Sequence, residues 1–134
     1  MQTKHYTINY LEKTGSFLKN LKEISYLPFK DLQEGIVLDL GCGTGADVIN
    51  LAQITQNRVK VIGIDHDPIL IDKALSNSAS DSTDVEFILS EVYSIPFENN
   101  SIVGIRAERL LQHLIEPEKL IKEVYIKKLV LIVF

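Results

Sequence analysis

The sequence predicts an α/β protein, a doubly wound parallel sheet with helices on both of its faces. Two observations lead to this fold class. Short apolar runs of strand length alternate with helical patterns along the 134 residues. The first of these runs also passes through a glycine-rich turn directly into a helical pattern. Strands that alternate with helices at this spacing form right-handed βαβ units, which place the strands in one parallel sheet.

Five segments have the length and composition of strands. They are rich in aliphatic and β-branched residues, and turn or loop residues separate them from the helical patterns. The polar stretch SNSASDSTD in front of the third segment is a loop by composition. The expected strands are Ile36–Leu40, Val59–Asp65, Val85–Leu89, Ser101–Ala107 and Lys128–Phe134.

Helical patterns fill most of the remaining chain. The clearest helix start is Asp67 followed by Pro68, because an aspartate side chain can cap the first turn and proline suits the first helical position. A proline also lies near the first position of the helix that follows the fourth strand. The expected helices cover Thr7–Tyr26 with an interruption at Gly15, Ala46–Thr55, the segment that begins at Asp67, and Glu116–Tyr125.

Length, charge and composition restrict the class of protein. A net charge of −4 and 46% hydrophobic residues in 134 residues indicate one soluble globular domain. The acidic balance argues against nucleic acid as a partner. The single cysteine excludes an internal disulfide and a multi-cysteine zinc site, which fits a reducing cytoplasm. We therefore expect a cytoplasmic protein without a metal site. Its longest apolar run, Leu129–Phe134, is too short to span a membrane.

The glycine-rich turn is the first candidate for a binding site. In IVLDLGCGTGADV, the segment Ile36–Val48, three glycines occupy every second position between a strand and a helix. Such a passage brings backbone N–H groups close to a ligand, often a phosphate. Here, however, Asp39 precedes the glycines, Asp47 follows them, and the segment contains no lysine or arginine.

The residues just after the strands are the other candidates. In doubly wound sheets, ligands bind beyond the carboxyl ends of the strands, where the strand order reverses. Acidic groups hold three of the four positions that follow the first four strands. These positions are Asp39 with the glycines, Asp65 with His66, Glu91 with Val92, and Arg106–Glu108.

A dinucleotide is one possible ligand. GCGTGA satisfies the pattern G-x-G-x-x-G/A through Gly41, Gly43 and Ala46, and Asp65 follows at about the right distance to bond ribose hydroxyls. A pyrophosphate would lie close to the two aspartates of this segment without a compensating cation. Two like charges about 4 Å apart repel by roughly 1 kcal/mol even in bulk water. The carboxylates thus favour a ligand with positive charge near the glycines, and an NAD-dependent oxidoreductase is the less favoured alternative.

S-adenosylmethionine has these features, since it carries an ammonium group, a sulfonium, a ribose diol and an adenine but no phosphate. VLDLGCGTG followed by VIGIDHDP resembles motifs I and II of the class I S-adenosylmethionine-dependent methyltransferases. FILSEVYSIPFENNSIVGIRAERLLQHLIEPEKLIKEV is similar to the segment after the third strand in ubiquinone/menaquinone-type and other small-molecule methyltransferases. The resemblance covers roughly Gly35 to Val124. It implies a Rossmann-like fold, S-adenosyl-L-methionine as cofactor and a small-molecule methyl acceptor.

The resemblance also implies roles for residues that match the family's motifs. The backbone at Gly41 and Gly43 would approach the nucleoside and methionine parts of the cofactor. Asp39 would help to hold the ammonium group, directly or through water. Asp65 would accept hydrogen bonds from both ribose hydroxyls.

Further residues would contact the adenine and the methionine end. Glu91 stands where the family usually has aspartate and would accept from the adenine amino group, while the N–H of Val92 would face the ring. Arg106 would line the methionine end through its backbone, and His66 would border the ribose and adenine. With Cys42 between the glycines, the predicted cofactor-binding residues are Asp39, Gly41, Cys42, Gly43, Asp65, His66, Glu91, Val92 and Arg106.

The sequence specifies less about the methyl acceptor. Methyl transfer from a sulfonium is a direct displacement, in which the protein mainly aligns the acceptor with the methyl group. A base is needed only when the acceptor must first lose a proton. His113 is the candidate base, and a histidine that only packs or faces solvent is the alternative. A nucleophilic role for Cys42 is disfavoured, because a lone cysteine without a partnered base is usually a small buried apolar group.

The C-terminus departs from the family pattern. Family members usually continue with R-V-L-K-P-G-G, a fifth strand, another helix and a final hairpin, whereas this chain reads YIKKLVLIVF. We therefore expect a sheet that lacks the family's last strands. Its fifth strand would lie at an edge, where it could pair with a second copy in a homodimer.

Three functional hypotheses stay open at this point. The favoured one is a methyltransferase for a small molecule. It would be a single domain over residues 1–134, with an N-terminal helical segment, 1–34, and a cofactor-binding core, 35–134. The second is a truncated domain that binds the cofactor but is catalytically incomplete. The third is the NAD-dependent oxidoreductase.

Overall fold

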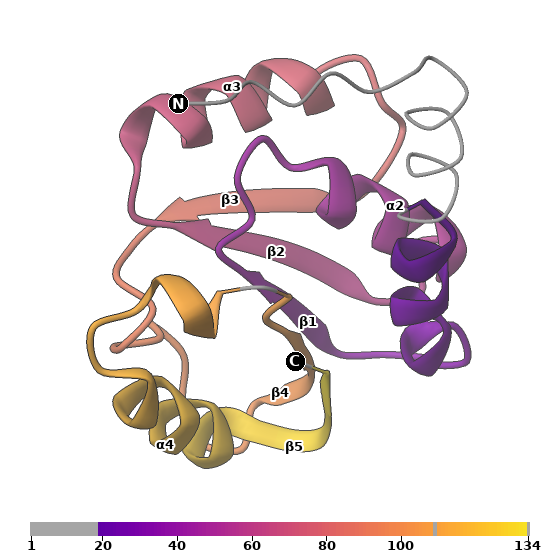
Figure 1. Cartoon of the computed structure of the whole chain (residues 1–134). Helices are drawn as coiled ribbons and strands as arrows, with labels where there is room; N and C mark the ends of the chain where they lie inside the picture. Colours follow the sequence, from indigo (N-terminus) through magenta and orange to yellow (C-terminus); the bar gives the residue numbers. More distant parts are fainter. Residues whose placement is uncertain (1–18, 109, 134) are drawn as a thin grey trace, which may run out of the picture.

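The centre of the structure, a computed structural model that describes residues 19–108 and 110–133, is a five-stranded sheet (Figure 1). Its strand order is β3-β2-β1-β4-β5, and every neighbouring pair is parallel. The predicted doubly wound parallel sheet is confirmed, and each of the five expected segments forms a strand. The strands are β1 (Ile36–Leu40), β2 (Lys60–Asp65), β3 (Val85–Leu89), β4 (Ile102–Arg106) and β5 (Lys128–Val133).

The helices begin where the sequence predicts them. In α3, Pro68 is the first residue, and Oδ1 of Asp67 accepts a hydrogen bond from the N–H of Ile69 at 2.9 Å, as expected of a helix cap. Residues 19–26 are helical, while residues 7–18 of the predicted N-terminal helix lie outside the described part of the chain. The other helical elements are α2 (Ala46–Ile54), α3 (Pro68–Ser78), α4 (Pro117–Lys127) and two 3₁₀ turns, η1 (Leu27–Phe29) and η2 (Leu111–His113).

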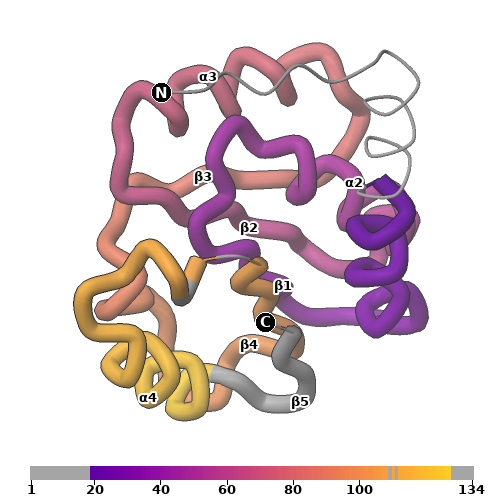
Figure 2. The backbone as a smooth tube through the Cα atoms, viewed as in Figure 1, coloured from indigo at the N-terminus to yellow at the C-terminus, as the bar shows by residue number. Residues whose placement is uncertain are grey.

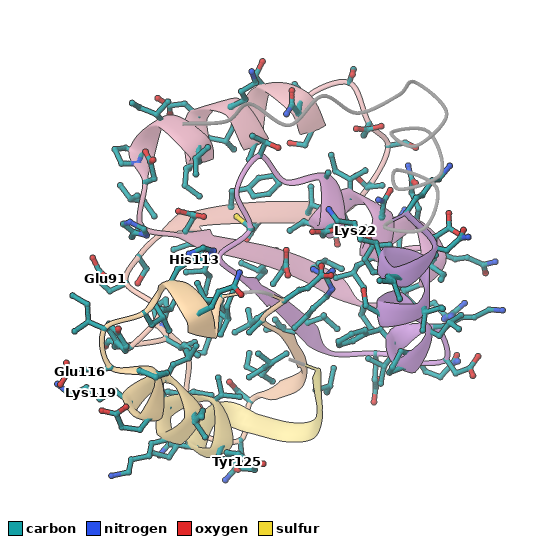
Figure 3. The ribbon with its side chains drawn as sticks, viewed as in Figure 1. Lys22, Glu91, His113, Glu116, Lys119 and Tyr125 are labelled. Carbon is teal, nitrogen blue, oxygen red and sulfur yellow. The ribbon has the colours of Figure 1, made fainter. Side chains whose placement is uncertain are left out.

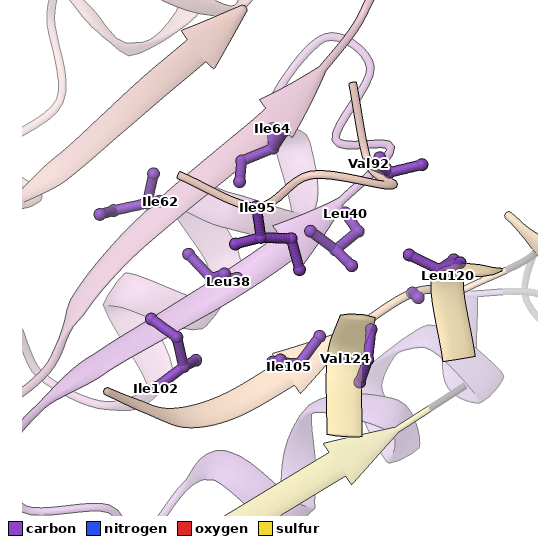
Figure 4. Packing of buried hydrophobic residues seen from close by; sticks show 11 residues of the cluster. Leu38, Leu40, Ile62, Ile64, Val92, Ile95, Ile102, Ile105, Leu120 and Val124 are labelled. Carbon is purple, nitrogen blue, oxygen red and sulfur yellow. The ribbon is translucent and has the colours of Figure 1, made fainter. Parts of the chain in front are cut away.

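Helices cover both faces of the sheet. On one face, Leu120 and Val124 of α4 and Ile95 from the loop after β3 pack on aliphatic residues of β1, β2 and β4 (Figure 4). On the other face, residues of α2 and α3 form a second buried cluster with β1 and β2. Tyr26 and Phe29 belong to this second cluster. The described part of the N-terminal segment therefore packs directly on the sheet.

The strand register brings the functional loops to one end of the sheet. Asp39 of β1 is aligned with Arg106 of β4, and Asp65 of β2 is aligned with Leu89 of β3. The connections run in opposite directions on the two sides of β1, so the strand order reverses between β1 and β4, which lie side by side in the middle of the sheet (Figure 2). This reversal is where doubly wound sheets bind ligands.

The sheet order puts β5 at one edge, next to β4, as the sequence predicts. Pairing of that edge with a second copy stays a prediction, and so does the division of the chain after residue 34. Within residues 19–108 and 110–133, no helix is long and apolar enough to cross a membrane. The cytoplasmic location also stays a prediction.

Candidate cofactor site

The glycine turn after β1 crosses the end of β2. The N–H groups of Gly41 and Cys42 both donate to the carbonyl oxygen of Ile64, at 2.8 and 3.0 Å. Gly41 and Gly43 have φ angles of +69° and +55°, a left-handed conformation that favours glycine. A Cβ added to Gly43 would meet no atom within 4 Å. The turn therefore leaves open space beside the backbone, as a cradle for a ligand requires.

Asp65, the last residue of β2, is fixed beside this turn. Its Oδ2 accepts a hydrogen bond from the N–H of Gly43 and its Oδ1 from the N–H of Asp67, each at 3.0 Å. The Nδ1 atom of His66 lies 3.6 Å from Oδ1. Because a carboxylate has about four acceptor positions, both oxygens can still accept from a ligand. The two hydrogen bonds from backbone N–H groups orient the carboxylate of Asp65 and leave it able to accept further hydrogen bonds.

A cavity of about 590 Å³ opens at this end of the sheet, within the range of roughly 300–1,000 Å³ typical of ligand pockets. Four carboxylates and two histidines line it, and none of the described lining residues is a lysine or an arginine. Figure 3 shows Glu91 and His113 toward the same end of the molecule. The lining residues are Gly41, Gly43, Asp65, His66, Asp67, Leu70, Glu91, Val92, Tyr93, Glu108, Leu110, His113, Leu114 and Ile115.

The cavity brings together most of the residues that the sequence selects. They come from the loops after four different strands, which the parallel register places at one end of the sheet. Asp39, Cys42 and Arg106 are not among the described residues that line the cavity. The predicted residues that do line it are Gly41, Gly43, Asp65, His66, Glu91, Val92 and His113.

Arg106 lies beneath the cavity wall in a cluster of carboxylates. Its side chain is 1% exposed, and its Nη1 lies 3.2 Å from Oδ1 of Asp39 and 3.2 Å from Oδ2 of Asp47. Its Nη2 donates to Oε2 of Glu108, and its guanidinium lies over the ring of Tyr26, 5.2 Å from the centroid. One buried cation therefore contacts three carboxylates from β1, α2 and the loop after β4.

This cluster perturbs the charge of its most buried member. Burial raises the pKa of Asp39 to about 7, an effect that outweighs the lowering by Arg106. Burial also lowers the pKa of Arg106, but the carboxylates of Asp39, Asp47 and Glu108 outweigh this and raise it, so the guanidinium stays charged. Contact of Asp39 with a ligand stays a prediction, and the structure directs its carboxylate toward Arg106.

Comparison with known proteins agrees with this geometry. A protein family described as a methyltransferase domain matches residues 37–126, more than half of the chain. The chain belongs to this methyltransferase family. The fold and the family together confirm the predicted class, the S-adenosylmethionine-dependent methyltransferases of class I, and with it the cofactor of that class.

The relatives of this chain have different names. The carboxy-S-adenosyl-L-methionine synthase of Sulfurimonas denitrificans is 28% identical over 117 residues, which are 85% of this chain and 49% of that protein. The arsenite methyltransferase of Halobacterium salinarum is 33% identical over 90 residues, 66% of this chain and 23% of that protein. The chain thus spans about a quarter to a half of the length of these relatives.

A solved structure shares the fold of this chain. A SAM dependent methyltransferase from Aquifex aeolicus superimposes with a TM-score of 0.65 at 25% identity. The match covers 84% of this chain and 66% of the Aquifex chain. The described domain therefore has the architecture of an S-adenosylmethionine-dependent methyltransferase.

Cys42 is buried beside the glycine cradle. A Cβ added to Gly63 of β2 would lie 2.8 Å from its Sγ, so the thiol packs closely on that strand. Burial, together with the nearby carboxylates of Asp39 and Asp65, raises the pKa of the thiol to about 12. The thiol is therefore protonated at neutral pH, which supports its interpretation as a small packed side chain.

The sequence gives several residues of the cavity no place in it. It indicates Glu108 as an ion-pair partner of Arg106 or Arg109, with a solvated surface position for the arginines as the alternative. The structure pairs Glu108 with Arg106, and the alternation of these two residues on one side of the chain is the local signal for that pair. Tyr93 and Leu110 lie in loops whose residues follow no helical or strand period. A contact such as that of Leu110 with Gly41 is made only when the loops fold together.

Proposed function

We propose that this chain binds S-adenosyl-L-methionine in the cavity and transfers its methyl group to a small-molecule acceptor. The observation that carries the proposal is the charge of the cavity wall. Asp65, Asp67, Glu91 and Glu108 line it, and the described lining includes no lysine or arginine. Such a wall attracts a ligand with a net positive charge and repels one that carries phosphates.

The ribose would bind at Asp65. Two backbone N–H groups already orient this carboxylate, and each oxygen retains room for a hydroxyl donor. Hydrogen bonds to an ionised carboxylate are about twice as strong as those between neutral groups. His66 would border the ribose without reacting.

The adenine would lie between the ends of β2 and β3. Glu91 and Val92 follow β3 and line the cavity with Leu70 of α3. Glu91 would accept from the adenine amino group, although its side chain is one methylene longer than the family's usual aspartate. Val92 and Leu70 would provide apolar contacts to the ring.

The acceptor would approach from the opposite side, formed by the chain after β4. Leu110, Leu114 and Ile115 give this side an apolar character, and Tyr93 closes it from the loop after β3. Bound cofactor supplies an activated methyl group on a positively charged sulfur. The residues of the chain exclude water and align the acceptor for a direct displacement. His113, which also lines the cavity, is the proposed base for acceptors that must lose a proton.

Two other ligand classes fit the cavity less well. The pyrophosphate of NAD would meet the carboxylates of the wall, and no lysine or arginine is among the described residues that line it. The name of the Sulfurimonas relative describes synthesis of a carboxylated cofactor. An additional carboxylate would likewise find no lysine or arginine among the described lining residues. A neutral or cationic acceptor is the better match.

Calorimetric titration with S-adenosylmethionine, S-adenosylhomocysteine and NAD tests the proposal. We expect the first two to bind and NAD not to bind. Asp65→Asn should weaken the binding of S-adenosylmethionine and of S-adenosylhomocysteine by at least about tenfold, because the substitution removes the negative charge that strengthens the hydrogen bonds to the ribose. Asp81→Asn, in the exposed loop before β3, is the matched control and should bind like the wild type. Binding of NAD alone, or unchanged binding by Asp65→Asn, would contradict the proposal. A screen for methyl transfer then separates an active enzyme from a domain that only binds the cofactor.

A further inference from the structure

The register of the sheet places Glu108 beside the glycine turn. Asp39 of β1 is aligned with Arg106 of β4. Two residues beyond this pair, the segment after β1 reaches Gly41 and the segment after β4 reaches Glu108. The chain after β4 indeed folds against the turn, since a Cβ added to Gly41 would lie 2.9 Å from Cδ1 of Leu110. Glu108 therefore lies at the reversal of strand order, next to the cradle.

Glu108 connects the buried cluster to the cavity. Its side chain is 22% exposed and lines the cavity, whereas Arg106, which donates to its Oε2, is 1% exposed and does not. Arg106 is fixed in turn by the hydroxyl of Ser25, which accepts from Nη2 at 3.1 Å and from Nε at 3.3 Å. The carboxylate is thus held in one orientation, and most of its acceptor positions stay available.

At neutral pH the cluster around Arg106 carries no excess of positive charge. Arg106 contacts three carboxylates, and the other cation is Lys22, whose Nζ lies 3.9 Å from Asp47 and whose side chain is 46% exposed. Two cations therefore face three carboxyl groups within the described part of the chain, and one of these groups, Asp39 with its raised pKa of about 7, is only partly charged at neutral pH. Glu108 is the member of this cluster that reaches the cavity, so a cationic group would be attracted there.

The other carboxylates of the cavity wall are less suited to bind a cationic group of the ligand. Asp65 holds two backbone N–H groups at the ribose position, and Asp67 caps α3. Glu91 follows β3, on the far side of β2 from the cluster, and is exposed to solvent. Glu108 combines a place beside Gly41 with a fixed orientation.

We propose that Glu108 is the residue that receives the ammonium group of S-adenosylmethionine, and that Arg106 is the positioning residue that holds it. In this arrangement Asp39 acts through Arg106, which it helps to fix, and makes no direct contact with the ligand. The inference rests on the proposed function, because it assumes that the cavity takes this cofactor.

Glu108→Gln tests the inference with two ligands. S-adenosylhomocysteine has the ammonium group, whereas 5′-methylthioadenosine has the same nucleoside and lacks the amino-acid end. We expect Glu108→Gln to weaken the binding of S-adenosylhomocysteine by at least about tenfold, because the substitution removes a charge-assisted contact. The affinity for 5′-methylthioadenosine should change less than about twofold. Glu118→Gln, exposed on α4, removes the same charge elsewhere and should bind both ligands normally.

Arg106→Lys tests the positioning role. Lysine keeps the charge but cannot donate to Asp39, Asp47 and Glu108 with the fixed fork of a guanidinium. We expect the same selective loss of S-adenosylhomocysteine, with 5′-methylthioadenosine retained as evidence that the site is folded. Equal loss of both ligands in Glu108→Gln, or loss of neither, would overturn the inference. If the wild type binds neither ligand, the proposed function itself fails and the inference fails with it.

Discussion

Asp39 and Asp65 are aspartates near the ends of neighbouring strands, and their surroundings give them different tasks. Asp65 lies at the cavity, where backbone N–H groups orient it. Asp39 is 2% exposed and faces Arg106. Burial raises the pKa of Asp39 to about 7 because one guanidinium, shared among three carboxylates, cannot replace the water that each of them loses. At the scale of one residue, depth below the surface separates a ligand-binding carboxylate from a supporting one.

The raised pKa of Asp39 predicts a specific pH dependence of stability. The folded protein holds a proton on Asp39 up to about pH 7, whereas the unfolded chain releases it near the usual value of 3.8. The stability contributed by this proton is complete below about pH 4 and is lost as the pH rises to about 7. We expect urea denaturation to show that the wild type loses stability relative to Asp39→Asn between pH 5 and pH 8. Asp81→Asn is the control and should follow the wild type. Parallel profiles for wild type and Asp39→Asn would contradict the assignment.

At the scale of an element, the glycines of the turn after β1 have two separate roles. Gly45 is packed, since a Cβ there would lie 2.7 Å from Cζ of Phe87 and 3.1 Å from the Cβ of Ala74. Gly43 faces open space. One glycine therefore lets α2 and the sheet approach each other, and the other leaves room for a ligand.

Alanine substitutions should separate the packing role of Gly45 from the ligand-binding role of Gly43. Gly43→Ala should lower the free energy of unfolding by only about 1–2 kcal/mol, the cost of a left-handed backbone with a Cβ. It should weaken S-adenosylhomocysteine by about tenfold or more, because the methyl group would occupy the cradle. Gly45→Ala should destabilise by about 1–3 kcal/mol more, because its Cβ clashes with Phe87. Chemical denaturation and calorimetry measure the two effects. Unchanged affinity in a folded Gly43→Ala protein would mean that the cradle is not used.

At the scale of the whole molecule, the site exists only through the sheet. Its walls come from the loops after β1, β2, β3 and β4, and parallel pairing brings the ends of these four strands together. The cores on the two faces hold the strands in that register. Because residues from all four loops line the cavity, binding of a ligand there would be linked to the stability of the entire sheet.

Ligand binding should therefore raise the unfolding transition of the whole chain. At a concentration of S-adenosylhomocysteine 100 times its Kd, linkage predicts a gain of about 2.7 kcal/mol. A thermal unfolding series should show one transition that moves upward with ligand concentration. NAD should not move it, and Asp65→Asn should require at least about tenfold more ligand for the same shift. A transition that does not respond to S-adenosylhomocysteine would argue against binding in the cavity.

The sequence by itself determined the alternation of strands and helices, the cap of α3 by Asp67 and the candidacy of Asp65 and the glycines. These features depend on local chemistry: periodicity, backbone freedom and the residue that follows each strand. Only the tertiary structure decided that Asp39 faces Arg106 and that Glu108 reaches the cavity, because a side chain's exposure depends on what packs above it. Ser25 and Tyr26, far from Arg106 in the sequence, complete that cluster. Contacts between distant segments leave no local pattern, so the fold was predictable while the distribution of charge within the site was not.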